Sequence, residues 1–461
     1  MSNSFRLYSL KINDRLFNNI DIRLCKDNTS TDDNYYSLII GNNGTGKSRV
    51  LSSIARFFNQ EYKQLSIFND FIYSRPPEKV ISLSSSISDK FPMDKTYRIY
   101  DQFEVKYKNL DYIYLGTRNR ANSYSTKALL NRAISIMFES YVDEKIAHNY
   151  RHIFDYLNYE PIIKIEYRIS IRNILDSKAE VTELSLLEYI KTNSNKDRYD
   201  SRYFDEFINS DKVFLSEMIN FLNEIKYKKS YEILVNFSEK GIKRINLNYD
   251  DYLNDYRTFK LLHILQKLRI VRETEIKVFK KGGVEFNFSE ASSGEANILS
   301  TLIALIPIVK SNSLILIDEP EISLHPLWQQ KYIDLLKNIF SHVSGCHIII
   351  ASHSPFLASD LPQNCSTVIS LLDAKNKIVS KVIEDSTYGW SLENVLLNVF
   401  NVPTVRNYYL SQILTEALEL LSDYNRDEKR LAELKVNLKV FYPSIKDNDP
   451  LKKVLELIIA N

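Results

Sequence analysis

Three short stretches of the sequence carry residue types that can bind and cleave a phosphate chain. The first is residues 41–48, GNNGTGKS, which fits the phosphate-binding loop (P-loop) pattern G-x-x-x-x-G-K-[ST] at every fixed position. Its glycines let successive backbone N–H groups point toward a phosphate, and the N-terminus of a following helix adds partial positive charge. Lys47 would then reach the β- and γ-phosphates, while Ser48 would hold a magnesium ion. The candidate nucleotide-binding residues of this loop are Asn42, Asn43, Gly44, Thr45, Gly46, Lys47 and Ser48.

The second and third stretches each follow an apolar run. Residues 314–317 (LILI) lead into Asp318 and Glu319, the Walker B arrangement of a nucleotide-hydrolysing enzyme. Four consecutive apolar residues bury the strand, so Asp318 emerges at its end beside the metal, and Glu319 is placed to polarise an attacking water. Residues 347–352 form another apolar run, whose end presents His353 in a position to contact a γ-phosphate. Together the three stretches predict an ATPase that uses Mg²⁺.

Strands and helices must hold these residues together. The apolar run before the P-loop predicts a buried strand, and the pattern at residues 49–58 predicts the helix that the loop needs after it. The predicted strands of this part of the chain occupy residues 5–10, 20–24, 35–40, 80–83 and 112–116. The first two of them alternate apolar with polar side chains, as half-buried antiparallel strands do. A polar segment follows the strand at residues 80–83, and a residue that senses the γ-phosphate could sit there, although no single side chain stands out. We expect an α/β fold with a mixed sheet and flanking helices.

A fourth stretch, residues 291–296 (ASSGEA), opens a predicted helix between the P-loop and the Walker B strand. Ser-Ser-Gly-Glu at a helix start resembles the signature motif of ABC-type ATPases, which include the SMC, RecF and OLD-like proteins. The P-loop of that family also favours Asn before the second glycine, as Asn43 stands here, and residues 321–326 (EISLHP) match its D-loop. All the motifs occur in the family's order, over roughly residues 1–116 and 274–372. The resemblance implies an ABC-type P-loop ATPase head.

The resemblance also implies a pair of heads. In this family two ATP molecules are sandwiched between two subunits, so Ser293 and Gly294 of one subunit would contact the γ-phosphate held by Lys47 of the other. The residues that the resemblance adds to the ATP site are Ser292, Ser293, Gly294, Glu295 and Ser323 of the D-loop. It further implies a homodimer or higher homo-oligomer joined through the heads, with slow ATP hydrolysis acting as a switch.

The rest of the chain departs from this pattern. Between residues 117 and 273 the sequence shows no nucleotide motif, and its periodicity predicts an insertion of helices with a small sheet. The elements predicted there are helices at 128–159 (stopped by Pro161), 204–224 and 259–271, a strand at 163–171 and a hairpin at 233–249. The predicted organisation is a first ATPase lobe at 1–116, an inserted region at 117–273, a second ATPase lobe at 274–386 and a helical C-terminal extension at 387–461. An apolar stripe in that extension fits either core packing or the docking of a partner.

The C-terminal sequence carries a second resemblance. It resembles the segment after the ATPase core in PtuA-type ATPases of bacterial Septu and retron anti-phage systems, and next that in AriA-type ATPases of PARIS systems. The matching positions are residues 387–396 and 402–404, with Phe400, Arg406 and Asn407. Such ATPases are encoded beside a nuclease effector, of HNH type for PtuA and of TOPRIM type for AriA. The resemblance implies an ATPase that assembles with, restrains and releases a nuclease, with the HNH type preferred and the TOPRIM type as alternative.

The sequence predicts that this nuclease is a separate chain. Asp447 and Asp449 have the Asp-x-Asp spacing of a TOPRIM centre, but Pro450 follows and no apolar strand leads into them, so we interpret residues 447–449 as a turn. No Cys or His cluster suggests an HNH metal site, and no C-x-x-C is available for a zinc hook. We therefore expect ATP hydrolysis without a nuclease centre in this chain.

A repair ATPase that acts directly on DNA, as SMC and RecF proteins do, is the alternative function. Between residues 257 and 283 eight Lys and Arg stand against two Glu, a local charge of +6. Such a stretch could contact nucleic-acid phosphates, and a solvated helix face is the other explanation. The net charge of +2 favours neither function.

Composition places the chain among soluble globular proteins, with 44% hydrophobic and 26% charged residues. No apolar stretch approaches the ~20 residues of a membrane span, and residues 1–6 lack the apolar core of a signal peptide. Cys25, Cys346 and Cys365 form neither a metal-ligand spacing nor a disulfide framework. We expect a cytoplasmic protein that does not bind membranes.

Overall fold

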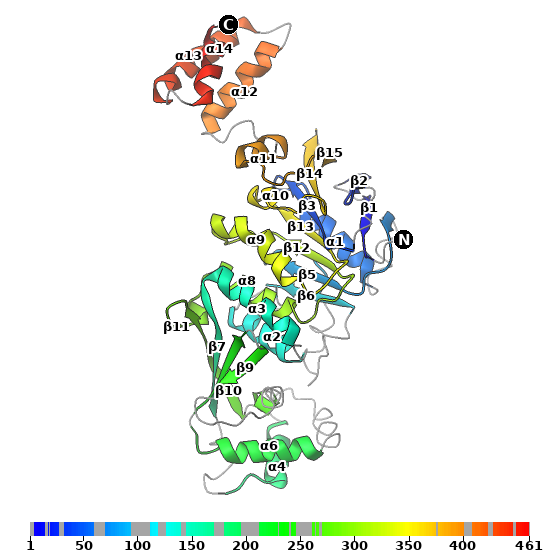
Figure 1. Ribbon diagram of the computed structural model, residues 1–461, viewed down its shortest axis with the longest axis vertical. Coiled ribbons are helices and arrows are strands. Elements are labelled where there is room, and N and C mark those ends of the chain that lie inside the picture. The colour runs from blue at the N-terminus through cyan, green and yellow to red at the C-terminus, as the bar shows by residue number, and fades with distance from the viewer. Residues whose placement is uncertain are drawn as a thin grey trace. The chain divides into compact units, whose positions relative to one another are not determined.

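The chain, seen in a computed structural model, forms two compact units, Met1–Ser386 and Thr387–Asn461 (Figure 1). The structure describes residues 4–13, 17, 19–26, 32–59, 70–93, 111–118, 126–139, 144–169, 179–194, 212–228, 230–238, 241–245, 261–262, 264–266, 270–374, 377–400, 408–422, 427–445 and 449–460. The further division of the first unit at residues 116 and 273 stays a prediction.

A seven-stranded mixed sheet forms the centre of the first unit. Its strands, in order across the sheet, are β15 (Lys377–Ile383), β14 (Ser366–Ala374), β3 (Tyr35–Gly41), β13 (His347–Ser352), β12 (Leu314–Asp318), β5 (Val80–Ser84) and β6 (Tyr112–Gly116). Every neighbouring pair is parallel except β14 and β15. The strands β3, β5, β6, β12 and β13 are buried along their whole length, so they read as continuous apolar runs in the sequence. The predicted α/β fold with a mixed sheet is confirmed.

The order β3, β13, β12 brings three segments to one edge of this sheet. Parallel neighbours present their carboxyl ends on the same side, and ligands of open α/β sheets bind there. The paired residues Ser352 and Ile40, and Asp318 and Ala351, fix this register. The residues that follow β3, β13 and β12 are therefore neighbours in space.

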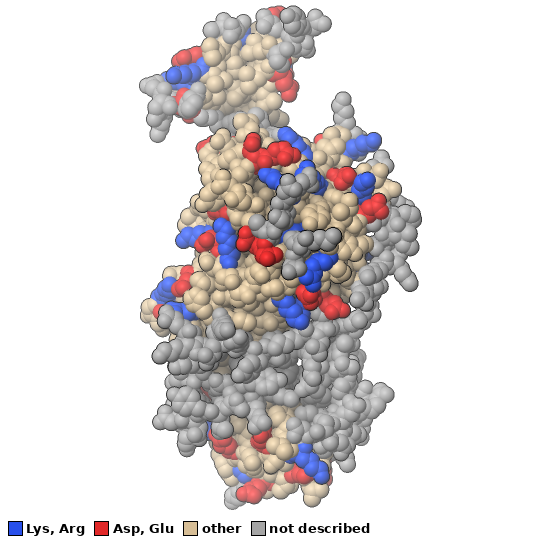
Figure 2. Space-filling model, turned by 45° about the vertical axis from the view of Figure 1, so that its right-hand side comes forward, with Lys and Arg blue, Asp and Glu red and all other residues tan. Residues whose placement is uncertain are grey.

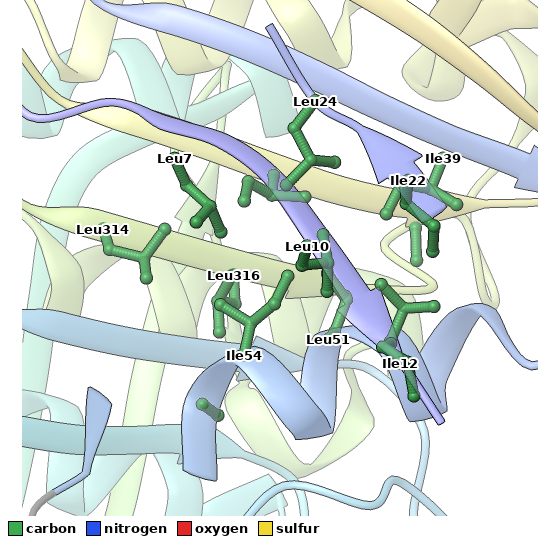
Figure 3. Close-up of a cluster of buried hydrophobic side chains, with 14 of the residues drawn as sticks. Leu7, Leu10, Ile12, Ile22, Leu24, Ile39, Leu51, Ile54, Leu314 and Leu316 are labelled. Atoms are coloured by element: carbon green, nitrogen blue, oxygen red, sulfur yellow. The ribbon is translucent and has the colours of Figure 1, made fainter. Parts of the chain in front are cut away.

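Helix α1 (Lys47–Phe58) packs between this sheet and a second one. The second sheet is antiparallel and consists of β2 (Ile20–Arg23), β1 (Leu7–Ile12) and β4 (Asp70–Tyr73), which confirms the two antiparallel strands predicted at the N-terminus. Figure 3 shows the shared core, which includes Leu7, Leu10 and Ile12 of β1, Ile22 of β2, Leu51 and Ile54 of α1, and Leu314 and Leu316 of β12. Each fully buried Leu or Ile contributes ~1.5–3 kcal/mol, so this cluster fixes the position of α1 on the sheet.

Further helices cover the first unit (Figure 1). They are α2 (Thr126–Glu139), α3 (Glu144–Leu157), α8 (Ser293–Leu305), α9 (Pro326–Ile339), the short α10 (Phe356–Ser359) and the 3-10 turn η5 (Phe288–Glu290). Helix α2 packs on α8, and α3 packs on α9. Within the described part of the chain, none of the helices combines the length and the apolarity that a membrane-spanning segment needs.

A five-stranded antiparallel sheet lies beside these helices. In order across the sheet, its strands are β11 (Val284–Asn287), β10 (Val271–Lys280), β7 (Tyr159–Ile169), β8 (Ser230–Ser238) and β9 (Gly241–Ile245). The same region contains α4 (Glu183–Ser194) and α6 (Lys212–Ile225). The predicted hairpin is confirmed as β8 and β9 up to Ile245, and the sheet draws strands from both sides of residue 273.

Several element boundaries differ from the prediction. The helix predicted at 128–159 is two helices, and Pro161 does not end it, because Asn158 turns the chain with a φ of 60° before β7 begins. Pro161 instead lies within β7, where the pairing with β10 shifts register, a place in a sheet that tolerates a residue without an N–H. Val271 begins β10 and is not helical. The parts of predicted elements that lie outside the described residues are 140–143, 170–171, 204–211, 239–240, 246–249, 259–260, 263 and 267–269.

The second unit is helical, as predicted. Its helices are α11 (Leu392–Asn398), α12 (Tyr408–Ser422), α13 (Glu428–Phe441) and α14 (Pro450–Ala460), with the 3-10 turn η6 (Tyr442–Ser444). The predicted apolar stripe packs into a core of α12, α13 and α14: Leu410, Ile413, Leu414 and Ala417 are buried there. Asp449 accepts a hydrogen bond from Leu451 N at 2.9 Å and so caps α14, while Asp447 lies outside the described residues.

Candidate active site

The P-loop joins β3 to α1 at the carboxyl edge of the central sheet. Gly44 and Gly46 have φ of 84° and 86°, values that residues with a Cβ rarely adopt. At Gly41 a Cβ would lie 2.5 Å from Leu371 O, so only glycine fits beside β14. Gly46 is the N-cap of α1, no side chain caps that helix, and its first turn contains no acidic residue. The geometry therefore leaves the N-terminal N–H groups and the helix dipole available for an anion.

Lys47 is 4% exposed and its ammonium group is held by three acceptors. Nζ donates to Gly41 O at 2.8 Å and to Asn42 O at 3.2 Å, and it lies 3.3 Å from Nδ1 of His353. Burial lowers the pKa of Lys47 to about 8, against the pull of the carboxylates Glu319, Glu321 and Asp318. A buried cation of this kind stabilises an anionic phosphate group strongly, since little water competes for it.

Ser48 and Asp318 supply neighbouring oxygen atoms. Ser48 Oγ donates to Oδ1 of Asp318 at 3.0 Å, although the two residues come from α1 and β12. Asp318 is 1% exposed, and burial raises its pKa to about 7. A buried carboxylate next to a hydroxyl fits Mg²⁺, which takes hard oxygen ligands, keeps several waters and needs only one or two protein groups. Among the described residues, no cluster of three or more His, Cys, Asp or Glu suited to a metal occurs.

Glu319 and His353 complete this group. Glu319 has a φ of 50°, an uncommon conformation for a residue with a side chain, and its N–H donates to Ala351 O of β13 at 2.9 Å. Its Oε1 lies 3.6 Å from Nε2 of His353. The nearby imidazole of His353 lowers the pKa of Glu319, so the carboxylate is ionised and able to accept a proton. The structure thus brings Lys47, Ser48, Asp318, Glu319 and His353 together at one edge of the sheet.

Glu321 belongs to this site as well, and no catalytic role was predicted for it. Its Oε1 accepts the backbone N–H of His353 at 2.5 Å. Burial raises the pKa of Glu321, and the hydrogen bond from the His353 backbone opposes that shift. The only signal for Glu321 in the sequence is its place as the first residue of the D-loop match at 321–326. Its contact with His353 forms only when β12 and β13 have paired.

The signature residues start α8. Ser292 is the N-cap: its side chain accepts from Glu295 N at 3.2 Å, and the Glu295 side chain accepts from Ser292 N at 2.8 Å. This reciprocal capping box fixes the helix start and leaves Ser292 and Ser293 exposed. Gly294 is buried, and a Cβ there would lie 2.3 Å from Ser323 O. The close approach of Ser323, in the D-loop of the same chain, therefore leaves room only for glycine at position 294.

The signature residues and Ser323 form a second group, separate from the P-loop group. Among the residues that the structure describes, no hydrogen bond joins Ser292–Glu295 or Ser323 to the P-loop. Residues of this second group line a cavity of about 610 Å³. Its lining consists of Ser293, Asn297, Ile322 and Ser323, together with residues 85–88 and Thr117. Asn297 Nδ2 donates to Ser85 Oγ at 2.5 Å, so α8 is tied to the loop after β5.

That loop after β5 is where the sequence predicted a residue that senses the γ-phosphate. It is anchored by Asp89, which is 3% exposed and accepts from Tyr114 Oη at 2.5 Å and from Phe91 N at 3.0 Å. Arg118 lies 3.5 Å from the same carboxylate, yet burial raises the pKa of Asp89. Asp89 also contributes to the raised pKa of Asp318. Sequence reasoning missed this anchor because Tyr114 and Arg118 lie far along the chain.

Of the four described basic residues of the stretch at 257–283, Lys277 and Lys281 lie beside acidic groups. Lys277 lies 3.0 Å from Glu285 and 3.5 Å from Glu275, and Lys281 lies 2.8 Å from Asp155. Figure 2 shows Lys and Arg interspersed with Asp and Glu on the face that it presents. Arg257, Lys260, Lys267 and Arg269 lie outside the described residues.

Comparison with known proteins agrees with this geometry. The family model of the AAA ATPase domain (AAA_15) matches residues 12–358, well over half of the chain. The Septu protein PtuA of Bacillus thuringiensis is 30% identical over 149 residues, 32% of this chain and 36% of PtuA. The retron Vc95 probable ATPase of Vibrio cholerae serotype O1 biovar El Tor is 21% identical over 439 residues, 87% of this chain and 81% of the relative.

Two further matches are a phage protein and a solved structure. Protein ea59 of Escherichia phage lambda is 27% identical over 186 residues, 37% of this chain and 35% of ea59, so the chain spans about a third of that protein and of PtuA. Among solved structures, the Smc head domain of Pyrococcus furiosus bound to the C-terminal domain of ScpA aligns with 82% of this chain and 96% of its own, at 10% identity and a TM-score of 0.32. The chain belongs to the AAA ATPase domain family and is similar to the ATPases of Septu and retron systems.

Proposed function

We propose that the chain hydrolyses ATP with Mg²⁺ at the carboxyl edge of its central sheet, and that the active site is completed by a second copy. One observation carries the first part: five side chains from the P-loop helix, β12 and the end of β13 converge within hydrogen-bonding range or close to it. Lys47 and His353 bind the γ-phosphate, and Ser48 and Asp318 hold Mg²⁺, which neutralises charge on the phosphates. Glu319 accepts a proton from the attacking water.

The second part follows from the separation of the two groups. Ser292 and Ser293 are exposed at the N-terminus of α8, an end of a helix that favours an anion, and among the described residues no hydrogen bond joins them to the P-loop of their own chain. A second copy related by a two-fold axis would bring its own P-loop to this surface, and each copy would complete the other's site. We propose a homodimer, or a higher homo-oligomer built from such pairs, that closes on ATP and opens after hydrolysis.

We further propose that this cycle restrains and releases a nuclease effector in anti-phage defence. The Septu and retron names of the relatives support this, as does the AAA ATPase domain. An HNH nuclease is the preferred effector and a TOPRIM nuclease the alternative, with no nuclease centre in this chain itself. We place the complex in the cytoplasm, in line with the three free cysteines.

Co-expression with the product of the neighbouring gene, followed by size-exclusion chromatography, tests the effector. Co-elution of the two proteins, with nuclease activity that changes when ATP is added, is the expected result. If the two proteins separate and the ATPase alone binds DNA tightly in a salt-sensitive manner, the regulator function is wrong and the repair ATPase is right. Of the described basic residues in the stretch at 257–283, Lys277 and Lys281 lie beside acidic groups, which weakens the case for a nucleic-acid surface there.

A further inference from the structure

Glu321 points a largely buried carboxylate at the end of β13. Its Oε1 accepts the N–H of His353 at 2.5 Å, immediately after the strand ends at Ser352. Because β13 stops there, that N–H has left the ladder of the sheet, and an unpaired buried N–H costs ~1–3 kcal/mol. The Glu321 side chain therefore holds the backbone of the residue whose imidazole lies 3.3 Å from Lys47 Nζ.

The turn that carries Glu321 is itself fixed at both ends. Ile322 N donates to Glu319 O at 3.2 Å, and Leu324 N donates to Glu321 O at 3.0 Å. Glu319 and Ser323 both have positive φ, 50° and 63°, so the backbone on either side of Glu321 is held in conformations that chains seldom adopt. The carboxylate is thus aimed by a turn with little freedom.

Gln329 of α9 makes a second bridge between the same two segments. Its Nε2 donates to Leu324 O at 3.0 Å, and its Oε1 accepts from Ser354 Oγ at 2.7 Å. Ser354 N in turn donates to Ser352 Oγ at 2.9 Å. The D-loop and the turn after β13 are therefore joined on both sides of His353, and Glu321 makes the contact to His353 itself.

We propose that Glu321 is a positioning residue for ATP hydrolysis: its carboxylate orients the His353 imidazole between Lys47 and Glu319 without touching the nucleotide. This inference rests on the proposed ATPase function. A direct proton-accepting role fits Glu321 less well than Glu319, because one of its two oxygens, Oε1, already accepts a backbone N–H and burial disfavours its ionised form. Glu319 fits that role, since its carboxylate is partly exposed and ionised.

The test compares three substitutions that separate hydrogen bonding from charge. Glu321→Gln keeps an oxygen acceptor at the same reach, and its kcat is expected to stay within about threefold of wild type. Glu321→Asp keeps the charge but is one methylene too short to reach His353 N, and Glu321→Ala removes the acceptor. Both are expected to lower kcat by ~10- to 100-fold with little change in KM, because a displaced catalytic group costs rate more than binding. The reverse order, with Asp active and Gln inactive, overturns the proposal.

A double-mutant cycle with His353→Ala completes the test. If Glu321 acts through His353, Glu321→Asp has no further effect on kcat in the His353→Ala background. Multiplicative losses would show that Glu321 acts independently and would refute the inference. Thermal unfolding of each variant identifies any that fail to fold, and Glu384→Ala, an exposed carboxylate on the β15 side, is the matched control with wild-type kcat. A wild-type protein without ATPase activity would refute the proposed function itself, a result distinct from either outcome of the cycle.

Discussion

Lys47 and His353 lie 306 positions apart in the chain, yet the Nζ of one is 3.3 Å from the Nδ1 of the other. An ammonium group has only protons to donate, so Nδ1 of His353 accepts and the imidazole proton resides on Nε2. That Nε2 faces Oε1 of Glu319 at 3.6 Å. The contact between Lys47 and His353 thus sets the tautomer of the imidazole and directs its N–H toward Glu319, the carboxylate that would activate water.

Lys47→Ala should abolish ATP binding. The substitution removes the one cation at the centre of the P-loop, and hydrogen bonds to a charged group contribute ~1.5–3 kcal/mol each, or at least about a tenfold loss of affinity per bond. Equilibrium binding of a fluorescent ATP analogue measures this. Lys381→Ala, an exposed lysine of β15, is the control and should bind as wild type does. Retained affinity in Lys47→Ala would contradict the P-loop assignment.

Glu319→Gln should bind ATP and hydrolyse it ~10²- to 10⁴-fold more slowly, because the proton acceptor is lost while the phosphate contacts remain. The closed pair of heads should then accumulate. Size-exclusion chromatography with light scattering, with and without ATP and Mg²⁺, reports the mass. A variant that remains monomeric in saturating ATP would argue against the composite site.

Gly294→Ala should lower the stability of the single chain, whereas Ser293→Ala should weaken only the ATP-dependent pairing of two chains. A Cβ at residue 294 would meet Ser323 O at 2.3 Å, and such overpacking costs ~1–3 kcal/mol, so this variant should unfold at a lower temperature even as a monomer. Ser293 is exposed, so its substitution should leave the unfolding temperature unchanged and weaken ATP-dependent pairing. Calorimetry and light scattering on both variants check this, and equal unfolding temperatures would show that Gly294 is not tightly packed.

Asp318 should make stability depend on pH and on magnesium. Burial raises its pKa from 3.8 to about 7, so the folded state holds its proton where the unfolded chain has lost it. Its contribution to the free energy of unfolding therefore falls as pH rises from about 4 to about 7 and is constant above. Mg²⁺ should restore stability at pH 8 and much less at pH 5. Thermal unfolding of wild type and Asp318→Asn checks this: the variant should not respond to Mg²⁺ and should show a smaller fall with pH, the rest of which comes from groups such as Asp89 and Glu321, whose pKa burial also raises.

Much of the fold and the grouping of the candidate site residues could be predicted because β3, β12 and β13 are buried parallel strands. Each reads as a largely apolar run, and the P-loop, the pair Asp318 and Glu319, and His353 stand at the ends of these runs. What the sequence could not show depends on contacts between distant segments. The sequence predicts a helix stop at Pro161, since its acceptance within β7 depends on the irregular pairing with β10. The anchoring of Asp89 by Tyr114 and the hold of Glu321 on His353 likewise exist only in the folded chain.

The turn from Glu319 to Ser323 touches both groups of the candidate site. On one side Gly294 at the start of α8 lies against Ser323 O with no room for a methyl group, and on the other Glu321 holds His353. A shift of α8 would therefore displace the turn and the histidine together. In a pair of heads, contact of one head with α8 of its partner would therefore also set the alignment of the partner's own catalytic groups. Hydrolysis at the two sites would then be coupled, and a mixed pair carrying one Glu319→Gln head is expected to turn over at less than half the wild-type rate.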